Sequence, residues 1–416
     1  MTFNSLGLTD SLLQAVQTTG YTIPTPIQKR VIPEILNGKD VMAAAQTGTG
    51  KTAGFTLPLL QLLGGRKQTH DRQVRGLVLT PTRELAAQIQ DSIGTYGLNE
   101  RLRHGVVFGG VNIDRQKQKL RRGLDILVAT PGRLLDLYQQ HSVKFDEIEV
   151  LILDEADRML DMGFIRDIRR ILALLPKRRQ NLMFSATFSN EIRKLAKTIC
   201  YNPVEIDMAP RNSTVKLISQ KMYKIDKPRK VDLLSSLIRS SADQTLVFSR
   251  TKHGANNLVK KLSRDNISAV AIHGSKSQAQ RTKALDAFKQ NKVQVLVATD
   301  IAARGIDIDQ LATVINFDLP HVPEDYVHRI GRTGRAGLSG VAISLVTNED
   351  KKQLRDIERL IKKSIPVADI AEFDLPARAQ IFEESAGRSD SKHSNEEKRQ
   401  PKYKKNKRRR TKNNIN

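Results

Sequence analysis

The stretch "DVMAAAQTGTGKT", residues 40–52, decides the fold of the first half of this chain. A run of small and apolar residues leads into a glycine-rich turn, and an apolar helical pattern follows Lys51 and Thr52. A strand, a glycine-rich turn and a helix in that order present free backbone N–H groups at a helix N-terminus, where they bind phosphate oxygens. The pattern G-x-x-x-x-G-K-T is met at Gly50, Lys51 and Thr52, with Ala45 at its first position. The stretch predicts a nucleotide-binding α/β fold; a glycine-rich turn without a ligand is the alternative.

Short apolar runs like the one before this turn recur along the chain and alternate with amphipathic helical patterns. Continuous apolar runs of four to six residues, most followed by a helix, are typical of a parallel sheet covered on both faces. The runs in the first half are "DVMAAA", "RGLVLT", "GVVFGG", "DILVAT", "VLILDE" and "NLMFSAT", and those in the second half are "QTLVFS", "SAVAIHG", "VQVLVATD", "ATVINF" and "GVAISLV". We therefore predict two successive parallel-sheet α/β domains.

Changes in composition suggest where these domains end. Proline, asparagine and serine cluster at residues 208–215, which we predict to be a linker between a first domain of residues 1–207 and a second of residues 216–368. The remaining residues, 369–416, become rich in Ser, Asn, Lys and Arg and poor in apolar residues. Such a segment cannot bury enough apolar surface to offset its loss of conformational entropy, so we predict a disordered basic tail.

The charge balance points to a polyanionic partner. The 416 residues include 69 Lys and Arg against 44 Asp and Glu, a formal net charge of +25. Nucleic acid is the favoured partner of such a chain, and an anionic membrane surface is the alternative. The single cysteine, Cys200, excludes an intramolecular disulfide, suits a reducing cytosol and is predicted to be an ordinary buried thiol. The N-terminus carries no signal peptide pattern, and no apolar run approaches the ~18 residues of a membrane span, so we expect a soluble cytoplasmic protein.

Acidic residues end the apolar strand of "LILDEAD", residues 151–157. Charge at a buried strand end is unfavourable unless a ligand or reaction there requires it. Asp154 suits the shell of a Mg²⁺ ion, which the Thr52 hydroxyl would also hold, and Glu155 suits a general base that orients the attacking water. Lys51 would reach the β- and γ-phosphates. Taken alone, the acids also fit an N-terminal helix cap.

These motifs occur together with "PTRELAAQ" at residues 81–88, "TPGR" at 130–133, "SAT" at 185–187 and "HRIGRTGR" at 328–335. The set closely resembles that of the DEAD-box RNA helicases of superfamily 2, over residues 1 to roughly 368, and an alanine at the head of the P-loop is the family's own form. The resemblance implies two tandem RecA-like domains and an RNA-stimulated ATPase that uses ATP and Mg²⁺. It also implies that Asp154 holds the ion through water and that the protein binds RNA as a monomer. "DEADRMLDMGF" and the short tail look most like the RhlE-type bacterial branch.

The resemblance also assigns an adenine-binding segment, "GYTIPTPIQ", in which Gln28 contacts the base edge and Phe3 is the upstream aromatic. A side-chain amide donates and accepts at once, which suits adenine. From the residues alone, "PTPIQ" is a proline-rich turn before a helix. The implied ATP contacts are Phe3, Tyr21, Gln28, Ala45, Gln46, Thr47, Gly48, Thr49, Gly50, Lys51, Thr52, Gly305 and Asp307.

Motifs that follow the predicted strands would hold RNA phosphates at the carboxyl-end rim of each sheet. By their sequence alone several of them are simply capped helix starts, and it is the resemblance that makes them RNA contacts. The implied contacts are Pro81, Thr82, Arg83, Gly109, Gly110, Thr130, Pro131, Gly132, Arg133, Arg250, Gln278, Arg281, Thr299 and Asp300. Contacts to the backbone imply little sequence specificity, and the absence of Trp argues against a base-stacking ladder.

The late stretch "HRIGRTGRAG", residues 328–337, taken alone favours a basic RNA-contacting loop. The resemblance makes Arg332 and Arg335 arginine fingers, a role worth roughly 10³–10⁵ in rate in related phosphoryl transfer. It gives His328 and Arg329 a coupling and supporting role. Coupling between the nucleotide and RNA sites is also implied for Asp157, Ser185, Ala186 and Thr187, although "SAT" alone is equally a strand-terminal turn.

The function expected from these features is an ATP-dependent RNA helicase. It would bind the RNA backbone across two domains, separate short duplexes or remodel RNA–protein complexes, and release RNA on ATP hydrolysis. A superfamily 2 DNA helicase and an RNA clamp timed by ATP hydrolysis are the alternatives. Ribosome assembly and RNA decay are both compatible with the motifs, and the basic tail fits either an RNA or a protein partner.

Overall fold

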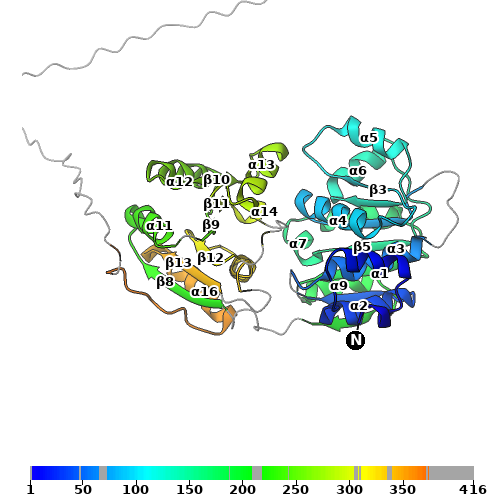
Figure 1. The fold of residues 1–416 in the computed structure, drawn as a ribbon, viewed down its shortest axis with the longest axis horizontal. Coiled ribbons are helices and arrows are strands. Elements are labelled where there is room, and N and C mark those ends of the chain that lie inside the picture. Colours follow the sequence, from blue (N-terminus) through cyan, green and yellow to red (C-terminus); the bar gives the residue numbers. More distant parts are fainter. Residues whose placement is uncertain are drawn as a thin grey trace, which may run out of the picture. The chain divides into compact units, whose positions relative to one another are not determined.

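In the computed structural model, the described residues are 2–45, 48–64, 73–186, 188–208, 218–241, 243–303, 308, 311–334, 340–371 and 373. They contain two parallel β-sheets, each flanked by helices (Figure 1). The predicted α/β class with two RecA-like parallel-sheet domains is confirmed, and the tail from residue 374 onward lies outside the described residues.

The first sheet has the strand order β3-β4-β2-β5-β6-β1-β7. Its strands are β1 (Val41–Ala44), β2 (Gly76–Leu79), β3 (His104–Val107), β4 (Ile126–Ala129), β5 (Val150–Leu153), β6 (Gln180–Ser185) and β7 (Val204–Asp207). The helices of this half are η1 (Phe3–Leu6), α1 (Asp10–Thr18), α2 (Pro26–Leu36), α3 (Lys51–Gly64), α4 (Arg83–Tyr96), α5 (Ile113–Arg121), α6 (Pro131–Gln139), α7 (Ala156–Asp161), α8 (Ile165–Leu174) and α9 (Asn190–Ile199).

Successive side chains of the first sheet enter two different cores. In β1, Val41 and Ala43 face a core shared with α1 to α4, whereas Met42 faces a core shared with α6 to α9. Phe55 of α3 packs against Phe184 of β6, with ring centroids 5.1 Å apart. Because both faces of a strand are buried, each strand needs a continuous apolar run, as the sequence predicted.

The second sheet has the strand order β10-β11-β9-β12-β13-β8. Its strands are β8 (Ile218–Lys224), β9 (Thr245–Phe248), β10 (Ala269–Ile272), β11 (Val295–Ala298), β12 (Thr313–Asn316) and β13 (Gly340–Val346). The helices of this half are η2 (Lys227–Arg229), α11 (Lys230–Arg239), α12 (Lys252–Arg264), α13 (Gln278–Lys289), α14 (Asp300–Ala303), α15 (Pro323–Ile330), η3 (Asn348–Asp350) and α16 (Lys351–Ile361).

Chain beyond α16 packs back on the start of the second sheet. Ala368 donates its backbone N–H to the carbonyl oxygen of Met222 at 2.8 Å. The Phe373 ring meets the Tyr223 ring edge-on, with centroids 5.6 Å apart. These contacts extend the packed part of the second half to residue 373.

Two strands were missed by the sequence analysis, and both lie at an edge of a sheet. In β7 only Ile206 is buried, and β8 alternates buried and exposed positions over most of its length. An edge strand with one solvated side has no continuous apolar run, so the pattern used for the buried strands does not detect it.

Side-chain caps fix the starts of several helices near the sheet rims. Thr25 and Ser277 form capping boxes at α2 and α13, and the hydroxyls of Thr82 and Thr251 accept N–H groups at α4 and α12. Among the residues that the structure describes, no helix is both long and apolar enough to cross a bilayer.

Candidate functional site

Three predicted motifs meet at the carboxyl end of the first sheet. The glycine-rich loop follows β1, the acidic motif follows β5, and "SAT" ends β6, which lies between these two strands. Ligands of open parallel sheets bind at this end of the strands. The topology therefore brings residues from distant parts of the sequence to one rim.

The P-loop is locked against the segment predicted to bind adenine. Gly48 and Gly50 have φ angles of +79° and +90°, with Thr49 between them. The Gln28 amide donates to the Gly50 carbonyl oxygen at 3.0 Å and accepts the Thr25 backbone N–H at 2.9 Å. A Cβ at Gly50 would lie 2.6 Å from the Gln28 amide nitrogen, so only glycine fits there. Each end of the Gln28 amide keeps one further hydrogen-bonding position.

Other predicted adenine-side residues differ in exposure. Phe3 is buried in the first core, whereas Tyr21 is 53% exposed. Gln46 and Thr47 lie outside the described residues.

Lys51 and Asp154 are both buried at the rim. The Lys51 ammonium donates to the carbonyl oxygen of Ala45 at 2.7 Å, and Thr52 follows it in the first turn of α3. Asp154 ends β5 and accepts the Glu155 backbone N–H at 3.0 Å. Burial raises the pKa of Asp154 and the Glu155 carboxylate adds to this rise, while the Lys51 ammonium opposes it. The arrangement concentrates negative charge beside the loop, which favours a cation there.

Glu155 has a strained backbone and a cationic partner that the sequence analysis did not identify. Its φ of 53° and ψ of 51° are left-handed, a conformation that costs about 1 kcal/mol or more for a residue with a Cβ. Arg158 forms a 2.5 Å ion pair with the Glu155 carboxylate, and both side chains are buried. Burial alone would raise the pKa of Glu155, but the Arg158 guanidinium and the Lys51 ammonium hold it below its usual value. Glu155 is thus kept ionised, as a general base requires.

The acidic motif is joined directly to "SAT". One Asp157 oxygen accepts the Ala186 backbone N–H at 3.0 Å, and the other accepts the Arg158 backbone N–H at the same distance. Ser185 is fully buried at the end of β6, and Thr187 lies outside the described residues. A shift of either motif would therefore strain the other.

The three predicted RNA motifs of the first half contact one another. The Arg83 guanidinium lies over Gly110 so closely that a Cβ at Gly110 would collide with it, and Gly110 has a φ of +75°. Both terminal nitrogens of Arg133 lie 3.2 Å from the carbonyl oxygen of Val111, next to this glycine pair. Burial lowers the pKa of Arg83, and the nearby Arg133 lowers it further. Two guanidinium groups thus share one short loop.

The remaining residues of these motifs begin helices. Thr82 caps α4, Thr130 precedes α6, and Pro131 and Gly132 occupy the first turn of α6. Gly109 has open space where a side chain would be. The backbone N–H groups at these helix starts point to the same rim as the two arginines, which is where a phosphate would be bound.

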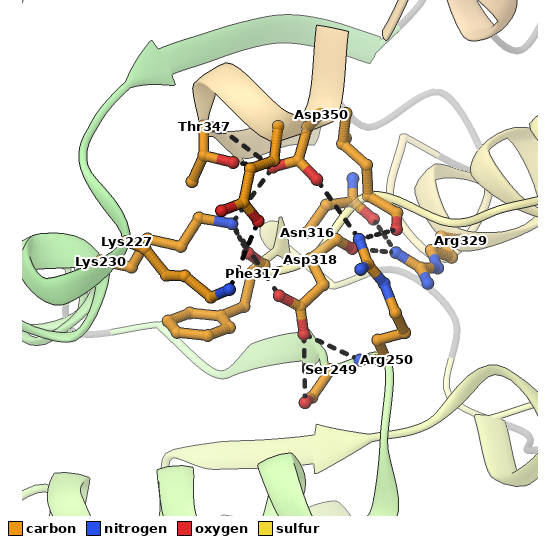
Figure 2. Close-up of polar contacts among 12 residues, drawn as sticks. Lys227, Lys230, Ser249, Arg250, Asn316, Phe317, Asp318, Arg329, Thr347 and Asp350 are labelled. Atoms are coloured by element: carbon orange, nitrogen blue, oxygen red, sulfur yellow. Dashed lines mark hydrogen bonds and ion pairs between the residues drawn. The ribbon is translucent and has the colours of Figure 1, made fainter. Parts of the chain in front are cut away.

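In the second half, a network of charged side chains holds the loop that follows β9 (Figure 2). Asp318 accepts the Arg250 backbone N–H at 2.9 Å and the Ser249 hydroxyl at 3.4 Å. The Arg250 guanidinium lies 3.3 Å from Asp350. Buried Lys230 lies between the two carboxylates, 3.9 Å from Asp318 and 3.7 Å from Asp350, and donates to a backbone carbonyl at 2.8 Å.

Arg329 is the most fully buried charged side chain in this network. Its guanidinium binds both oxygens of Asp300, at 2.5 and 2.8 Å, and donates to Asn316 at 3.0 Å and to the Asp318 carbonyl oxygen at 2.6 Å. It also lies over the Phe248 ring, 4.9 Å from the centroid. Arg329 therefore ties α15 to the ends of β9, β11 and β12.

The other predicted residues of the second half lie near these strand ends. Thr299 follows β11, Gln278 and Arg281 occupy the first turn of α13, and His328 lies in α15 with its Nδ1 4.0 Å from Asp325. Arg332 follows α15, and its carbonyl oxygen accepts the Leu311 N–H at 3.2 Å. Gly305, Asp307 and Arg335 lie outside the described residues.

Comparison with known proteins identifies the family of this chain. Residues 25–195 match the family model for DEAD/DEAH box helicases, and residues 229–337 match the model for the helicase conserved C-terminal domain. The DEAD-box ATP-dependent RNA helicase CshA of Bacillus cereus is 43% identical over 380 residues, which cover 91% of this chain and 72% of that protein. The chain belongs to the DEAD-box ATP-dependent RNA helicases.

Other DEAD-box proteins support the same placement. RhpA of Helicobacter pylori is 43% identical over 369 residues, 88% of this chain and 74% of that protein. Saccharomyces cerevisiae Dbp5 bound to RNA and ADP BeF3 matches with a TM-score of 0.78 at 31% identity, over 88% of this chain and 95% of that one. A DEAD box protein from Methanococcus jannaschii matches with a TM-score of 0.53 at 40% identity, over 89% and 99% of the two chains. As a member of this family, the protein is an RNA helicase that couples unwinding to ATP hydrolysis.

Several functional contacts of this DEAD-box helicase were not found from its sequence. The Glu155–Arg158 pair has a three-residue spacing on a helix, and this local signal could have identified it. Lys230 and Asp350 carry no motif and lie far apart in the chain, so nothing in the sequence links them to Arg250.

Proposed function

We propose that Lys51, Asp154 and Glu155 form the ATP hydrolysis site. The observation that carries this proposal is their burial together at one sheet rim, with Glu155 held ionised by Arg158 and Lys51. Lys51 neutralises charge on the β- and γ-phosphates, and Glu155 accepts a proton from the water that attacks the γ-phosphate. Gln28, held against the P-loop, reads the adenine edge with its free donor and acceptor.

The residues present fit a Mg²⁺ ion. This ion prefers a few oxygen ligands and retains several waters, and the Thr52 hydroxyl and the Asp154 carboxylate are such ligands. The negative charge that Asp154 and Glu155 concentrate supports a cation at this position. When bound, Mg²⁺ would neutralise charge on the phosphate oxygens. We assign Thr52 as a direct ligand and Asp154 as a ligand through water.

For RNA, we propose that the arginines and helix starts of the first half bind successive phosphates. Arg83 and Arg133 share the loop at Gly110, and α4 and α6 begin beside them. Such contacts carry little sequence information, so the enzyme would recognise the phosphate backbone and the 2′-hydroxyls of the RNA. Arg250, Gln278, Arg281, Thr299 and Asp300 continue this surface in the second half.

Arg332 and Arg335 are proposed to complete hydrolysis as arginine fingers. The Arg329 ion pair with Asp300 supports this role, because it fixes the helix that leads into Arg332. Gly305 and Asp307 contact the nucleotide from the same half. The Asp157–Ala186 hydrogen bond supports a coupling role for the "SAT" segment. ATP and RNA would then each increase the affinity for the other, since both ligands favour the same conformation in which the two domains close on them.

The biological setting is proposed from the charge of the chain and its resemblance to the RhlE-type branch. We propose a monomeric, cytoplasmic enzyme of the RhlE-type branch that acts on structured RNA in ribosome assembly or RNA decay. A net charge of +25 supports an RNA partner. The proposed domains are residues 1–207 and 216–368, with a linker at 208–215 and a tail at 369–416, and the first residues of this tail include Ile370 and Phe373, which pack on the second domain. Crosslinking in cells followed by RNA sequencing would identify the substrate, and limited proteolysis would map the boundaries.

Two substitutions test the hydrolysis site. Glu155→Gln should keep ATP binding but release RNA at least ~100-fold more slowly, because the attacking water loses its base. Arg335→Ala should keep ATP binding and lose at least ~10³-fold in RNA-stimulated turnover. Arg359→Ala, on the exposed side of α16, is the matched control. Normal RNA release by the first variant, or near-normal turnover by the second, would refute the assigned role.

A further inference from the structure

A basic groove lies on the first half, away from the motifs described above. Its volume is about 1060 Å³, and it is lined by Gln90, residues 102–105 and residues 119–124. These segments are part of α4, the chain that leads into β3 and its start, the last turn of α5 and the turn that leads from α5 into β4. The groove therefore lies at the amino ends of β3 and β4. Strand β3 is an edge strand of the first sheet.

The groove lies at the opposite end of these strands from the RNA motifs. Gly109 and Gly110 follow the carboxyl end of β3, whereas His104 and Gly105 begin it. A four-residue strand spans about 10–13 Å, so the groove is separated from the rim by roughly that distance. An RNA strand that leaves the rim could reach the groove within a few nucleotides.

The charge of the groove is entirely positive among its lining residues. Arg103, Lys119, Arg121 and Arg122 line it and are exposed, and no Asp or Glu lines it. One Arg103 guanidinium nitrogen donates to the carbonyl oxygen of Arg122 at 2.7 Å, which fixes one wall. Burial lowers the pKa of His104, and the nearby Asp91 carboxylate opposes this shift. The positive potential of the groove therefore comes from these four exposed side chains.

The lining lacks the features of a protein-binding surface. Its apolar members Leu120 and Leu124 are buried in the second core of the first sheet, and Leu102 packs against the first. No aromatic side chain lines the groove, and protein interfaces take most of their binding energy from exposed apolar and aromatic anchors. A phosphate backbone, in contrast, requires only cationic donors.

We propose that this groove is a second RNA-binding surface, which holds the phosphate backbone of RNA flanking the segment bound at the sheet rim. Lys119, Arg121 and Arg122 contact the phosphates, and Arg103 shapes the groove. The groove increases the length of RNA that contacts the protein and does not contribute to hydrolysis. It rests on the RNA-binding activity of the family and not on the roles proposed above for single residues.

The test compares the full-length wild type with the triple variant Lys119→Gln, Arg121→Gln and Arg122→Gln. Binding is measured across a salt series for a single strand of about ten nucleotides, enough to fill one site, and for the same strand extended to about thirty. Neutralising three phosphate contacts should lower the slope of log affinity against log salt by about 2 for the long strand. Affinity for the long strand at low salt should fall about tenfold.

A matched control removes the same charge elsewhere. Lys260, Lys261 and Arg264 are exposed on α12, and their substitution by glutamine should leave the slope for the long strand within error of the wild type. The groove variant should also retain wild-type affinity for the short strand and wild-type ATPase at saturating short RNA. Those two results would show that the hydrolysis site and the rim still work.

Three results would overturn the proposal. The first is a slope for the long strand that the groove variant does not change. The second is an equal loss of affinity for the short strand, which would make the groove part of the rim surface. The third is unchanged RNA binding with lost binding of poly-glutamate, which would identify an acidic protein partner. Loss of ATPase in Glu155 or Arg335 variants would leave this inference unaffected.

Discussion

Replacing Asp300 with asparagine should loosen α15 and the strand ends that it contacts. The wild-type carboxylate binds the Arg329 guanidinium through both oxygens, at 2.5 and 2.8 Å. Asparagine keeps the size of the side chain and one acceptor oxygen but removes the charge. The nearly fully buried Arg329 would retain Asn316 and the Asp318 carbonyl oxygen as partners, without a bidentate counterion.

The magnitude follows from the burial of each partner. Breaking a buried ion pair costs about 3–5 kcal/mol, because it leaves an uncompensated charge. The Arg329 side chain is 2% exposed, but that of Asp300 is 24% exposed, so water screens part of the loss. We therefore expect Asp300→Asn to lower the free energy of local opening at α15 by about 2–3 kcal/mol. This corresponds to a roughly 30- to 150-fold increase in the population of the locally open state.

Hydrogen exchange measured by mass spectrometry on the full-length protein resolves this effect by segment. Amides of α15 and β12 should exchange faster by that factor, whereas those of the first sheet should not change. Asp356→Asn is the matched control, since it removes a carboxylate from an exposed pair, 3.8 Å from Arg359, that contributes about 0.5 kcal/mol or less. RNA-stimulated ATPase should fall together with protection, because Arg332 directly follows α15.

The result that would refute this reasoning is wild-type exchange in α15 combined with weakened RNA binding. Asp300 would then serve only as the RNA contact proposed above, and its ion pair with Arg329 would not hold α15 in place. Loss of protection with near-normal RNA affinity would instead establish Asp300 as a positioning residue for α15.

Three further predictions concern the P-loop, the cysteine and the tail. Gly50→Ala should weaken ATP binding at least tenfold in a fluorescent-nucleotide titration, because a Cβ at Gly50 would lie 2.6 Å from Gln28 and a φ of +90° disfavours alanine. Unchanged affinity would contradict the requirement for glycine against Gln28. Cys200 is only partly buried, yet this burial raises the pKa of its thiol to about 12. The native thiol should therefore react with a disulfide reagent at pH 8 at least ~100-fold more slowly than in the unfolded chain, and equal rates would contradict the raised pKa. Deleting residues 392–416, which carry eleven Lys and Arg against two Glu, should reduce the salt slope of RNA binding by several units, whereas an unchanged slope would point to a protein partner.

The sequence was sufficient for features that depend on local pattern. Strands buried on both faces need continuous apolar runs, and these runs located the interior strands of both sheets. The P-loop and the acidic motif each follow such a strand, so parallel topology alone placed them at one rim. Edge strands β7 and β8 were missed because one side of each is solvated, which interrupts the apolar run.

Contacts between distant residues could not be predicted in the same way. Arg250 was expected to bind RNA, but nothing in its surroundings indicated that Asp350, one hundred residues later, lies 3.3 Å from its guanidinium. Lys230 likewise has no motif, and its burial between Asp318 and Asp350 depends on the folding of η2 and η3 against the sheet. Burial and charge pairing of this kind arise only from tertiary structure.

Arg83 in the first half and Arg329 in the second differ in how their charge is balanced by neighbouring groups, and this difference predicts different roles. In the first half, burial lowers the pKa of Arg83 and the nearby Arg133 lowers it further, although Arg133 itself lies 3.5 Å from the Asp136 carboxylate. In the second half, Arg250 and Arg329 are each paired with a carboxylate, which neutralises much of their charge. Substituting Arg83 should therefore lower the slope of log affinity for single-stranded RNA against log salt by about 0.7, whereas substituting Arg329 should alter stability and turnover with little change in that slope. Such a result would assign the two arginines different roles, Arg83 in electrostatic affinity for RNA and Arg329 in holding α15 in place.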